Sequence, residues 1–279
     1  MPERLLVCTD LDRTLLPNGS QPESPQAREH FASLVASPWV TLAYVSGRHR
    51  ALVEQAILDY RLPVPDFVVG DVGTTIYRVG SEQAWTQLTP WEEEFASDWA
   101  GRSHAGLKAL LHDLSDLQLQ EASKQNDYKL SYYVPLQCNR DGLETAIRHC
   151  FRESGIRASL IWSIDEPMGI GLLDILPERA SKLHALEALM KLNGFDYSNT
   201  VFCGDSGNDI EVLASAIPAA LVANAQADVR ELARRLADEK GFGAQLYLAQ
   251  GGFMGMNGNY SAGILEGIAH YHPEITGWI

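Results

Sequence analysis

The sequence predicts an α/β protein with a doubly wound parallel-sheet (Rossmann-like) core and an inserted α+β cap domain. The first observation is an alternation of short apolar runs with amphipathic stretches at both ends of the 279-residue chain. Unbroken apolar strands between amphipathic helices are typical of a parallel sheet that is covered on both faces. The second observation is a different rhythm in the middle of the chain, where helices alternate with pairs of strands.

The core elements are predicted at both ends of the chain. In the first part, strands are expected at "LLVCT", "VTLAYVS" and "DFVVGD", with helices over 24–36 and 49–59. The final third resumes this order, with a helix over 181–193, the strand "TVFCG", a helix from 208, the strand "AALVAN" and a helix over 226–238. We therefore assign residues 1–79 and 173–279 to the core.

Residues 80–172 are predicted to form the cap. Residues 89–113 and 140–154 are expected to be helical, and each helix precedes two strands: "LQLQEAS" with "KLSYYVP", and "ASLIWSI" with "GLLDILP". This α+β pattern indicates a unit separate from the parallel sheet. Glycines tolerate unusual backbone angles, so hinges are expected at Gly80-Ser81 and near Gly169-Ile170-Gly171.

Composition excludes several classes of function. The formal net charge of −14 argues against nucleic acid or an anionic membrane as the main partner. No apolar stretch is long enough to span a bilayer, and acids interrupt the N-terminal apolar run, so neither a membrane protein nor a secretory signal is expected. The four cysteines lack metal-ligand spacing, which favours reduced thiols in a cytoplasmic protein.

Polar side chains follow three of the predicted core strands. Asp10 ends the first strand, Ser46 ends the next, and Asp205 ends a later one. Ligands of doubly wound sheets bind beyond the carboxyl ends of the strands, so these groups are expected to converge. Asp209, one helical turn beyond Asp205, is expected to reach the same place.

Two other interpretations of these acids explain less of the pattern. A calcium loop needs Gly at its sixth position and Glu at its twelfth, where this chain has Leu15 and Gln21. A helix cap and an ordinary turn would explain either acidic motif alone. They do not explain both motifs at strand ends, in order, with Lys182 between them.

These residues resemble the motifs of the haloacid dehalogenase superfamily, on its phosphatase side. The matching segments are Asp10-Leu11-Asp12-Arg13-Thr14, Ser46, Lys182 and Gly204-Asp205-Ser206-Gly207-Asn208-Asp209. A narrower resemblance is to the sucrose-6-phosphate phosphatases, carried by "KQNDYKLSYYV", "LLDILPERASK", "CGDSGNDIEVL", "VANAQ" and "SAGILEGIAHY". Leu183, Asp127 and the Gly-rich loop 251–259 depart from that family's pattern, and the last two of these departures leave the sugar open.

The resemblance implies a Mg²⁺-dependent phosphatase that acts through an aspartyl-phosphate intermediate. Asp10 would be the nucleophile, Asp12 the general acid and base, and Lys182 a partner of both phosphate and Asp10. Ser46, Gly47 and Lys182 are the expected phosphate-binding residues. The expected metal ligands are Asp10, Asp12 (through its carbonyl), Asp205 and Asp209. The expected substrate contacts are Gln125, Asn126, Lys129 and Asn208.

The substrate that this resemblance implies is a phosphorylated disaccharide or related glycoside, best matched by sucrose 6-phosphate. Mannosylfructose phosphate and glucosylglycerol phosphate stay open, as does a phosphomutase. A non-catalytic partner of a sugar-phosphate synthase is a further alternative, against which the intact Asp10, Asp12, Lys182 and Asp205 argue. A cytoplasmic monomer is expected, with a sucrose-phosphate synthase as a candidate partner and neither nucleic acid nor membrane.

Overall fold

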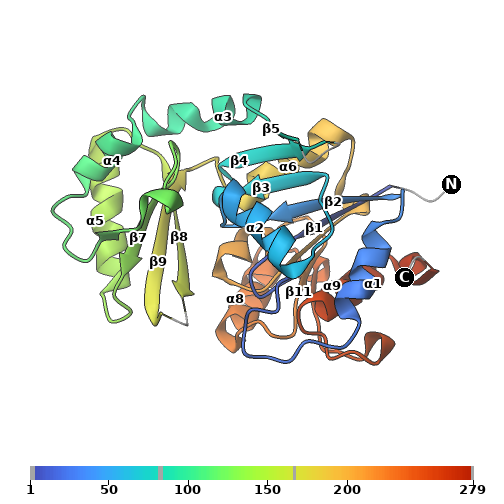
Figure 1. Ribbon diagram of the computed structural model, residues 1–279. Helices are drawn as coiled ribbons and strands as arrows, with labels where there is room; N and C mark the ends of the chain where they lie inside the picture. Colours follow the sequence, from blue (N-terminus) through green and yellow to red (C-terminus); the bar gives the residue numbers. More distant parts are fainter. Residues whose placement is uncertain (1–3, 81–83, 166–167, 278–279) are drawn as a thin grey trace.

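Two sheets organise the chain, and Figure 1 shows them side by side with their helices. The structure is a computed structural model that describes residues 4–80, 84–165 and 168–277. Within these ranges the larger sheet has eight strands, in the order β12-β11-β10-β1-β2-β3-β4-β5, and the smaller has four, in the order β6-β7-β9-β8. The predicted α/β core with a second α+β unit is confirmed.

The larger sheet is parallel except at one edge. Its parallel strands are β1 (Leu5–Thr9), β2 (Val40–Val45), β3 (Phe67–Gly70), β10 (Thr200–Gly204), β11 (Ala219–Leu221) and β12 (Leu246–Leu248). An antiparallel hairpin, β4 (Thr75–Val79) and β5 (Trp85–Gln87), extends the sheet beyond β3. The sheet is therefore a parallel one with an antiparallel margin.

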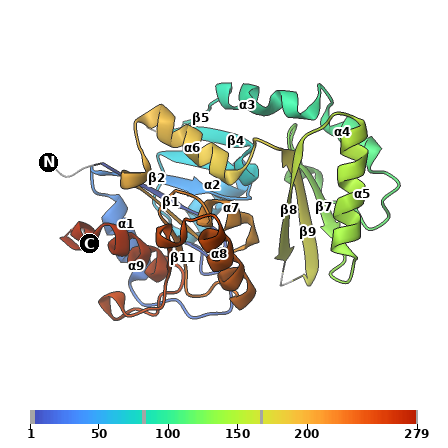
Figure 2. The same ribbon diagram turned by 180° about the vertical axis from the view of Figure 1, so that it is seen from behind.

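Helices cover both faces of the larger sheet. One face carries α1 (Ala27–Val35), α2 (Arg50–Tyr60) and α9 (Ser261–Tyr271). The other carries α3 (Pro90–Phe95), α6 (Lys182–Asn193), α7 (Ile210–Leu213) and α8 (Ala227–Glu239), three of which lie in front of the sheet in Figure 2. In β1, Leu5 and Val7 pack on the first face while Leu6 and Cys8 pack on the second. This double burial explains why β1 is apolar without alternation.

The smaller sheet and its helices form the cap. Its strands are β6 (Gln118–Leu119), β7 (Leu130–Val134), β8 (Ala158–Asp165) and β9 (Ile170–Pro177), and all pairings are antiparallel. The helices α4 (His104–Leu110) and α5 (Arg140–Glu153) pack on the face away from the core, as Figure 1 shows. The cap has its own apolar cluster, as a separate structural unit is expected to have.

The strands do not divide between the two sheets at the predicted boundaries between core and cap. Residues 85–87 pair with β4 in the larger sheet, and residues 173–177 belong to β9 of the smaller one. The hinge expected at Gly169–Gly171 is wrong, because Gly171 pairs with Val134 and Ile164 within the smaller sheet. At the other expected hinge, Ser81 lies outside the described residues. The chain instead enters the cap after α3 and leaves it after β9.

Several expected elements are shorter or broken. The helix expected over 89–113 is interrupted at Ala100 and Gly101, which both have positive φ. The strand "LQLQEAS" is reduced to β6, and the helix from 208 begins as a short 3₁₀ turn, η6 (Gly207–Asp209). All four cysteines are free, as expected.

The Gly-rich loop 251–259 packs against the segment that follows the first acidic motif. The side-chain amides of Asn257 and Asn259 donate to the Pro22 carbonyl at 2.9 and 3.0 Å. The buried Glu266 carboxylate accepts the backbone N–H groups of Gln250 and Gly251, both at 2.9 Å. These hydrogen bonds therefore hold the loop against α9 and against the segment around Pro22.

A buried carboxylate fastens the base of the cap. Asp98 has no exposed surface and accepts hydrogen bonds from the backbone N–H and guanidinium of Arg179 and from Arg157, the latter at 2.5 Å. Asp98 and Arg179 belong to the two segments that join the cap to the core, whereas Arg157 precedes β8 within the cap. Asp98 therefore ties together the connections about which the cap could turn.

We expect Asp98→Asn to lower the free energy of unfolding by about 1–3 kcal/mol, because charge-assisted hydrogen bonds are lost. Burial acts to raise the pKa of Asp98, but Arg179 and Arg157 lower it overall from 3.8. The stabilisation is therefore present at neutral pH and is lost as the pH falls below about 4. Urea unfolding at pH 7 and pH 3 measures both effects. The exposed Asp113→Asn is the control, and an equal loss in both variants would contradict the assignment.

Candidate active site

The acidic motifs converge at one edge of the larger sheet. Asp10 follows β1 and Asp205 follows β10, which pair directly, and Ser46 follows β2 on the other side of β1. From β1 the chain adds β2 and β3 on one side of the sheet, whereas β10, β11 and β12 lie on the other side. The strand order therefore reverses between β1 and β10. Ligands of α/β sheets bind at such points.

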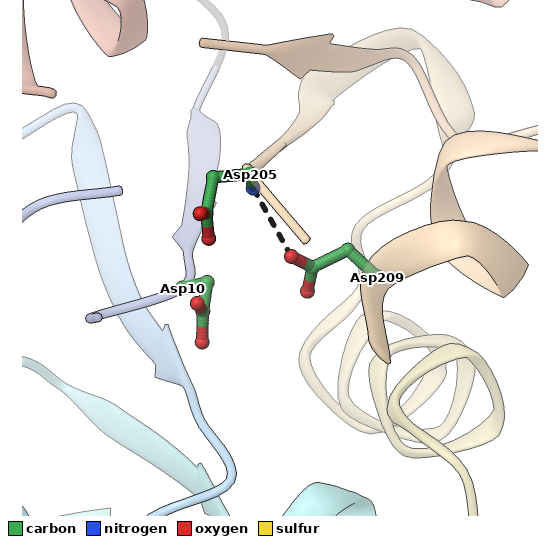
Figure 3. Close-up of side chains that lie close together, drawn as sticks. All are labelled: Asp10, Asp205 and Asp209. Carbon is green, nitrogen blue, oxygen red and sulfur yellow. Dashed lines mark hydrogen bonds between the residues drawn. The ribbon is translucent and has the colours of Figure 1, made fainter. Parts of the chain in front are cut away.

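Three buried carboxylates lie together there. Side-chain oxygens of Asp10, Asp205 and Asp209 fall within 4.8 Å of one another. Figure 3 shows the three side chains close together. The Asp209 carboxylate also accepts the backbone N–H of Asp205 at 3.1 Å. A side chain at Gly204 would place its Cβ 2.6 Å from Asp209, so only glycine allows this approach. The cluster offers the hard oxygen ligands that Mg²⁺ and Ca²⁺ prefer.

Lys182 is the buried cation of this cluster. Its Nζ donates to Asp10 at 3.0 Å, to Asp209 at 2.7 Å and to Asn208 at 3.1 Å. Ser181 caps α6 by accepting the His184 N–H, which fixes Lys182 at the first helical position. Burial acts to lower the pKa of Lys182, but Asp10 and Asp209 raise it overall, so the ammonium stays charged.

The acids of the cluster outnumber its cations. Burial raises the pKa of Asp10 well above 3.8, although Lys182 opposes the rise. Burial and the neighbouring Asp209 raise the pKa of Asp205 to about 7, although Arg13, 3.5 Å away, opposes that. Carboxylates held together at such a cost are typical of a site for a divalent cation.

Asp12 lies beside the cluster but its side chain pairs elsewhere. Its two oxygens accept hydrogen bonds from Arg48 at 2.6 and 2.7 Å, and Asn18 donates to it at 2.7 Å. Burial acts to raise the pKa of Asp12, but these partners lower it overall. Asp12 is thus an ionised acceptor in this conformation. Arg48 was not among the predicted site residues, and its position directly after Ser46-Gly47 was the available signal.

The remaining predicted core residues line the same edge. Ser46 is fully buried and its hydroxyl accepts the Arg48 N–H at 3.2 Å. The Gly47 carbonyl faces the cap, and Asn208 is held by Lys182 and Ser206. We call residues 46–48 the phosphate loop, because the sequence predicts that Ser46 and Gly47 bind phosphate.

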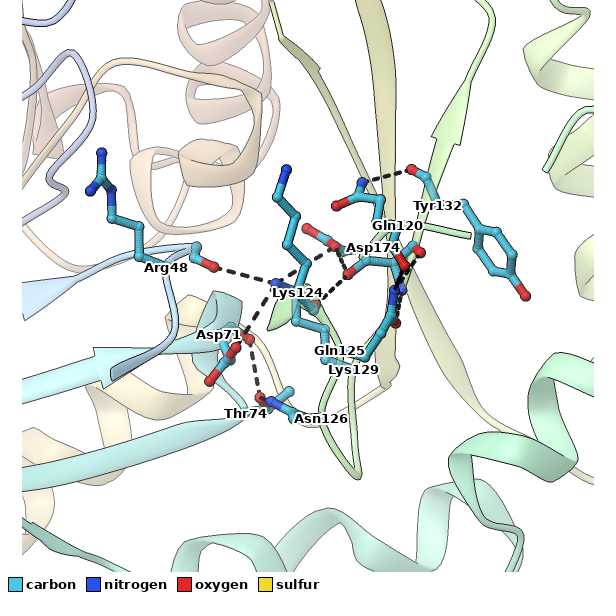
Figure 4. Close-up of polar contacts among 12 residues, drawn as sticks. Arg48, Asp71, Thr74, Gln120, Lys124, Gln125, Asn126, Lys129, Tyr132 and Asp174 are labelled. Carbon is cyan, nitrogen blue, oxygen red and sulfur yellow. Dashed lines mark hydrogen bonds and ion pairs between the residues drawn. The ribbon is translucent and has the colours of Figure 1, made fainter. Parts of the chain in front are cut away.

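Two predicted cap residues reach across to the core (Figure 4). Lys129 Nζ donates to the Gly47 carbonyl at 3.3 Å and lies 3.9 Å from carboxylate oxygens of both Asp71 and Asp174. Asn126 donates to the Thr74 hydroxyl at 3.0 Å. The cap is therefore docked on the core, with Lys129 above the phosphate loop.

Gln125, the third predicted cap residue, is occupied within the cap. Its amide nitrogen donates to the carbonyls of Gln120 and Ser131 at 3.1 and 2.9 Å. Its amide oxygen accepts the Ser131 N–H at 2.8 Å and lies 3.1 Å from His104 Nε2. Both amide donors are thus engaged, and the amide oxygen lies between the Ser131 N–H and the His104 ring, so Gln125 is committed to contacts within the cap in this conformation.

The family model for sucrose-6F-phosphate phosphohydrolases matches residues 3–272. The chain belongs to this family. It is therefore a phosphoric monoester hydrolase of the haloacid dehalogenase superfamily, and the resemblance found from the motifs is confirmed. Among the described residues, no helix has the length and apolarity needed to cross a membrane.

Other members of this phosphohydrolase family and superfamily match most of the chain. A protein of Nitrosococcus oceani, described only as a HAD-like hydrolase, is 55% identical over the whole chain, which covers 75% of that protein. Sucrose-phosphatase 2 of Nicotiana tabacum is 28% identical over 81% of the chain, which spans only 52% of that relative's length. The sucrose-phosphatase of Synechocystis, solved with sucrose and phosphate, has a TM-score of 0.79 at 26% identity, covering 97% of this chain and 99% of that one.

Proposed function

We propose that this phosphohydrolase releases phosphate from a phosphorylated disaccharide or related glycoside in a Mg²⁺-dependent reaction, with sucrose 6-phosphate as the leading substrate. The observation that carries the proposal is the placement of Asp10. It is buried beside Lys182 and two further carboxylates, directly below a docked cap. The Synechocystis neighbour, solved with sucrose and phosphate, supports the choice of sugar.

Each site residue has its own role in the proposed reaction. A carboxylate oxygen of Asp10 attacks the phosphorus, the bond to the sugar oxygen breaks, and protonated Asp12 supplies that oxygen's proton. In the second step Asp12 takes a proton from water, which attacks the phosphorus and frees Asp10. Because Arg48 lowers the pKa of Asp12, the acid step requires this ion pair to loosen. Lys182 and Ser46 would hold phosphate oxygens.

The carboxylate cluster fits Mg²⁺ on the grounds of its oxygen ligands and its uncompensated charge. Asp10, Asp205 and the Asp12 carbonyl would hold the ion, with Asp209 beside them. Bound there, Mg²⁺ supplies positive charge that neutralises the phosphate dianion.

We expect Mg²⁺ to raise the melting temperature of the wild-type protein but not of Asp205→Asn. A ligand at 100 times its Kd stabilises a fold by about 2.7 kcal/mol, and the variant lacks a charged ligand atom. Removing a buried carboxylate should leave the metal-free protein at least as stable as wild type. Calorimetry with and without Mg²⁺ measures this, with the exposed Asp59→Asn as control. An equal gain in Asp205→Asn would place the ion elsewhere.

A phosphate-release screen tests the proposed function. Sucrose 6-phosphate, mannosylfructose phosphate, glucosylglycerol phosphate and an aryl phosphate would each be incubated with the protein and Mg²⁺. Free phosphate from a glycosyl phosphate supports a phosphatase and argues against a phosphomutase, which returns the phosphoryl group to the sugar. Release from none of the four substrates would favour the non-catalytic alternative.

We further propose a cytoplasmic monomer that works beside a sucrose-phosphate synthase. The free cysteines support the compartment. Light scattering of the isolated protein tests the monomer, and co-purification with the synthase tests the partner.

A further inference from the structure

A polar pocket lies beside the phosphate loop, where the first turn of α2 faces the cap. It has a volume of about 570 Å³, and its lining includes His49, Arg50, Glu54, Asp71, Tyr77 and Gln125. His49 follows the phosphate loop directly, and Lys129 joins the two regions by contacting both Gly47 and Asp71. A molecule whose phosphate lies at Asp10 would therefore reach this pocket with its other end.

Asp71 is the unusual group of this pocket. Only 4% of the residue is exposed, yet Oδ1 accepts no hydrogen bond from any residue that the structure describes. Its nearest cation, Lys129 Nζ, is 3.9 Å away, and its other oxygen lies 3.4 Å from the Thr75 hydroxyl. Buried carboxylate oxygens are almost always hydrogen-bonded, because an unmatched acceptor is costly. The Oδ1 atom of Asp71 therefore lacks a hydrogen-bond donor.

The backbone around Asp71 is strained, and neighbouring residues hold it in this conformation. Asp71, Val72 and Gly73 have consecutive positive φ values of 51°, 60° and 105°, and a β-branched residue rarely adopts such an angle. The phosphate loop stabilises this turn: the Asp71 N–H donates to the Arg48 carbonyl at 3.0 Å, and the Val72 N–H donates to the Ser46 carbonyl at 3.1 Å. Strain of this kind persists where the surrounding structure enforces it, often at binding sites.

The charges around the pocket favour a neutral ligand with hydroxyl groups. Lys129 is shared between the carboxylates of Asp71 and Asp174, and Glu54 accepts a hydrogen bond from Arg50 at 2.9 Å. A further cation or anion would disturb these pairs, whereas a hydroxyl supplies one donor without charge. The cap wall offers no free amide N–H from Gln125, because both of its amide donors are engaged. A hydroxyl of a bound ligand can therefore supply the donor that Asp71 Oδ1 lacks.

We propose that Asp71 is a specificity-determining residue whose Oδ1 accepts a hydroxyl of the substrate's sugar ring remote from the phosphate. This inference rests on the proposed function. It adds that core residues, as well as cap residues, select the sugar of the substrate. The sugar hydroxyl completes the hydrogen bonding of a buried carboxylate, so a ligand without that hydroxyl is rejected.

Asp71→Gly tests this inference, because glycine adopts a φ of 51° without cost and removes the acceptor. We expect its kcat/KM for the preferred glycosyl phosphate to fall about 10- to 100-fold. Its kcat/KM for p-nitrophenyl phosphate, which has no sugar, should stay within about twofold of wild type. Asp71→Asn, which keeps an acceptor oxygen, should lie between, and Asp59→Asn controls for the lost charge.

Each other outcome overturns the inference. An equal loss on both substrates would assign Asp71 to the support of the phosphate loop, and an unchanged glycosyl phosphate activity would show that the sugar does not reach it. In both cases the proposed function stands. A wild-type enzyme that cleaves only the aryl phosphate would overturn the proposed function together with the inference. Melting temperatures of the variants confirm that they are folded.

Discussion

Asp10→Asn is expected to lower phosphate release by about 10³-fold or more while leaving the fold intact. Asparagine has nearly the shape of aspartate but is not a nucleophile, so the covalent route is closed. The backbone of the loop is held independently, since the Asp10 N–H donates to the Cys203 carbonyl at 2.9 Å. The substitution also removes a buried carboxylate whose raised pKa marks it as costly to ionise, so stability should not fall.

Acid quenching with a ³²P-labelled substrate gives the decisive measurement. Wild type should carry label on the protein, and Asp10→Asn should carry none. Asp12→Asn is the matched control, because it has the same change of charge two residues away but keeps the nucleophile. With an aryl phosphate, whose leaving group needs no acid, this control should still become labelled. A labelled, active Asp10→Asn protein would refute the assignment of the nucleophile.

The sequence was most informative where strands are buried on both faces. The strand expected at "TVFCG" has the bounds of β10, and the one at "LLVCT" has the bounds of β1. A central parallel strand shows as an unbroken apolar run, and the polar residue that ends the run marks the carboxyl edge of the sheet. The convergence of Asp10, Asp205 and Asp209 followed from that rule and from their order along the chain.

Elements at the margin of the core carried no such signal. The antiparallel strands β4 ("TIYRV") and β5 ("WTQ") are short and mix polar with apolar residues, which does not distinguish them from a loop. Helix α9 could not be predicted for the opposite reason. Its residues Ser261–Ile268 are all buried, so no polar stripe reveals a helical period. Small residues pack closely there, and a Cβ at Gly267 would collide with Ala220.

Pairings between distant residues could not be predicted either. Asp12 and Arg48 are 36 residues apart, and only the adjacency of β1 and β2 brings them together. Asp71 was expected to end a strand, but the chain turns at that point through three positive φ angles. The neighbours that enforce this turn come from the phosphate loop and from α6, so tertiary packing overrides the local preference of the segment.

Lys182→Met is expected to lower the free energy of unfolding of the metal-free protein by about 3–5 kcal/mol and to abolish turnover. Methionine resembles the aliphatic part of the lysine side chain but leaves Asp10 and Asp209 without their cation. Urea unfolding in the presence of a chelator measures the loss. Lys191→Met, an exposed change on the same helix, is the control and should cost little.

A second variant distinguishes lost charge balance from lost packing. In Lys182→Met/Asp209→Asn one unpaired buried carboxylate is also removed, so part of the lost stability should return, although the catalytic lysine is still missing. Mg²⁺ should likewise restore stability to Lys182→Met, because it supplies positive charge to the same acids. If neither change restored stability, the cost would lie in the packing of Lys182. The repulsion among Asp10, Asp205 and Asp209, on which the cation site is argued, would then be too weak to matter.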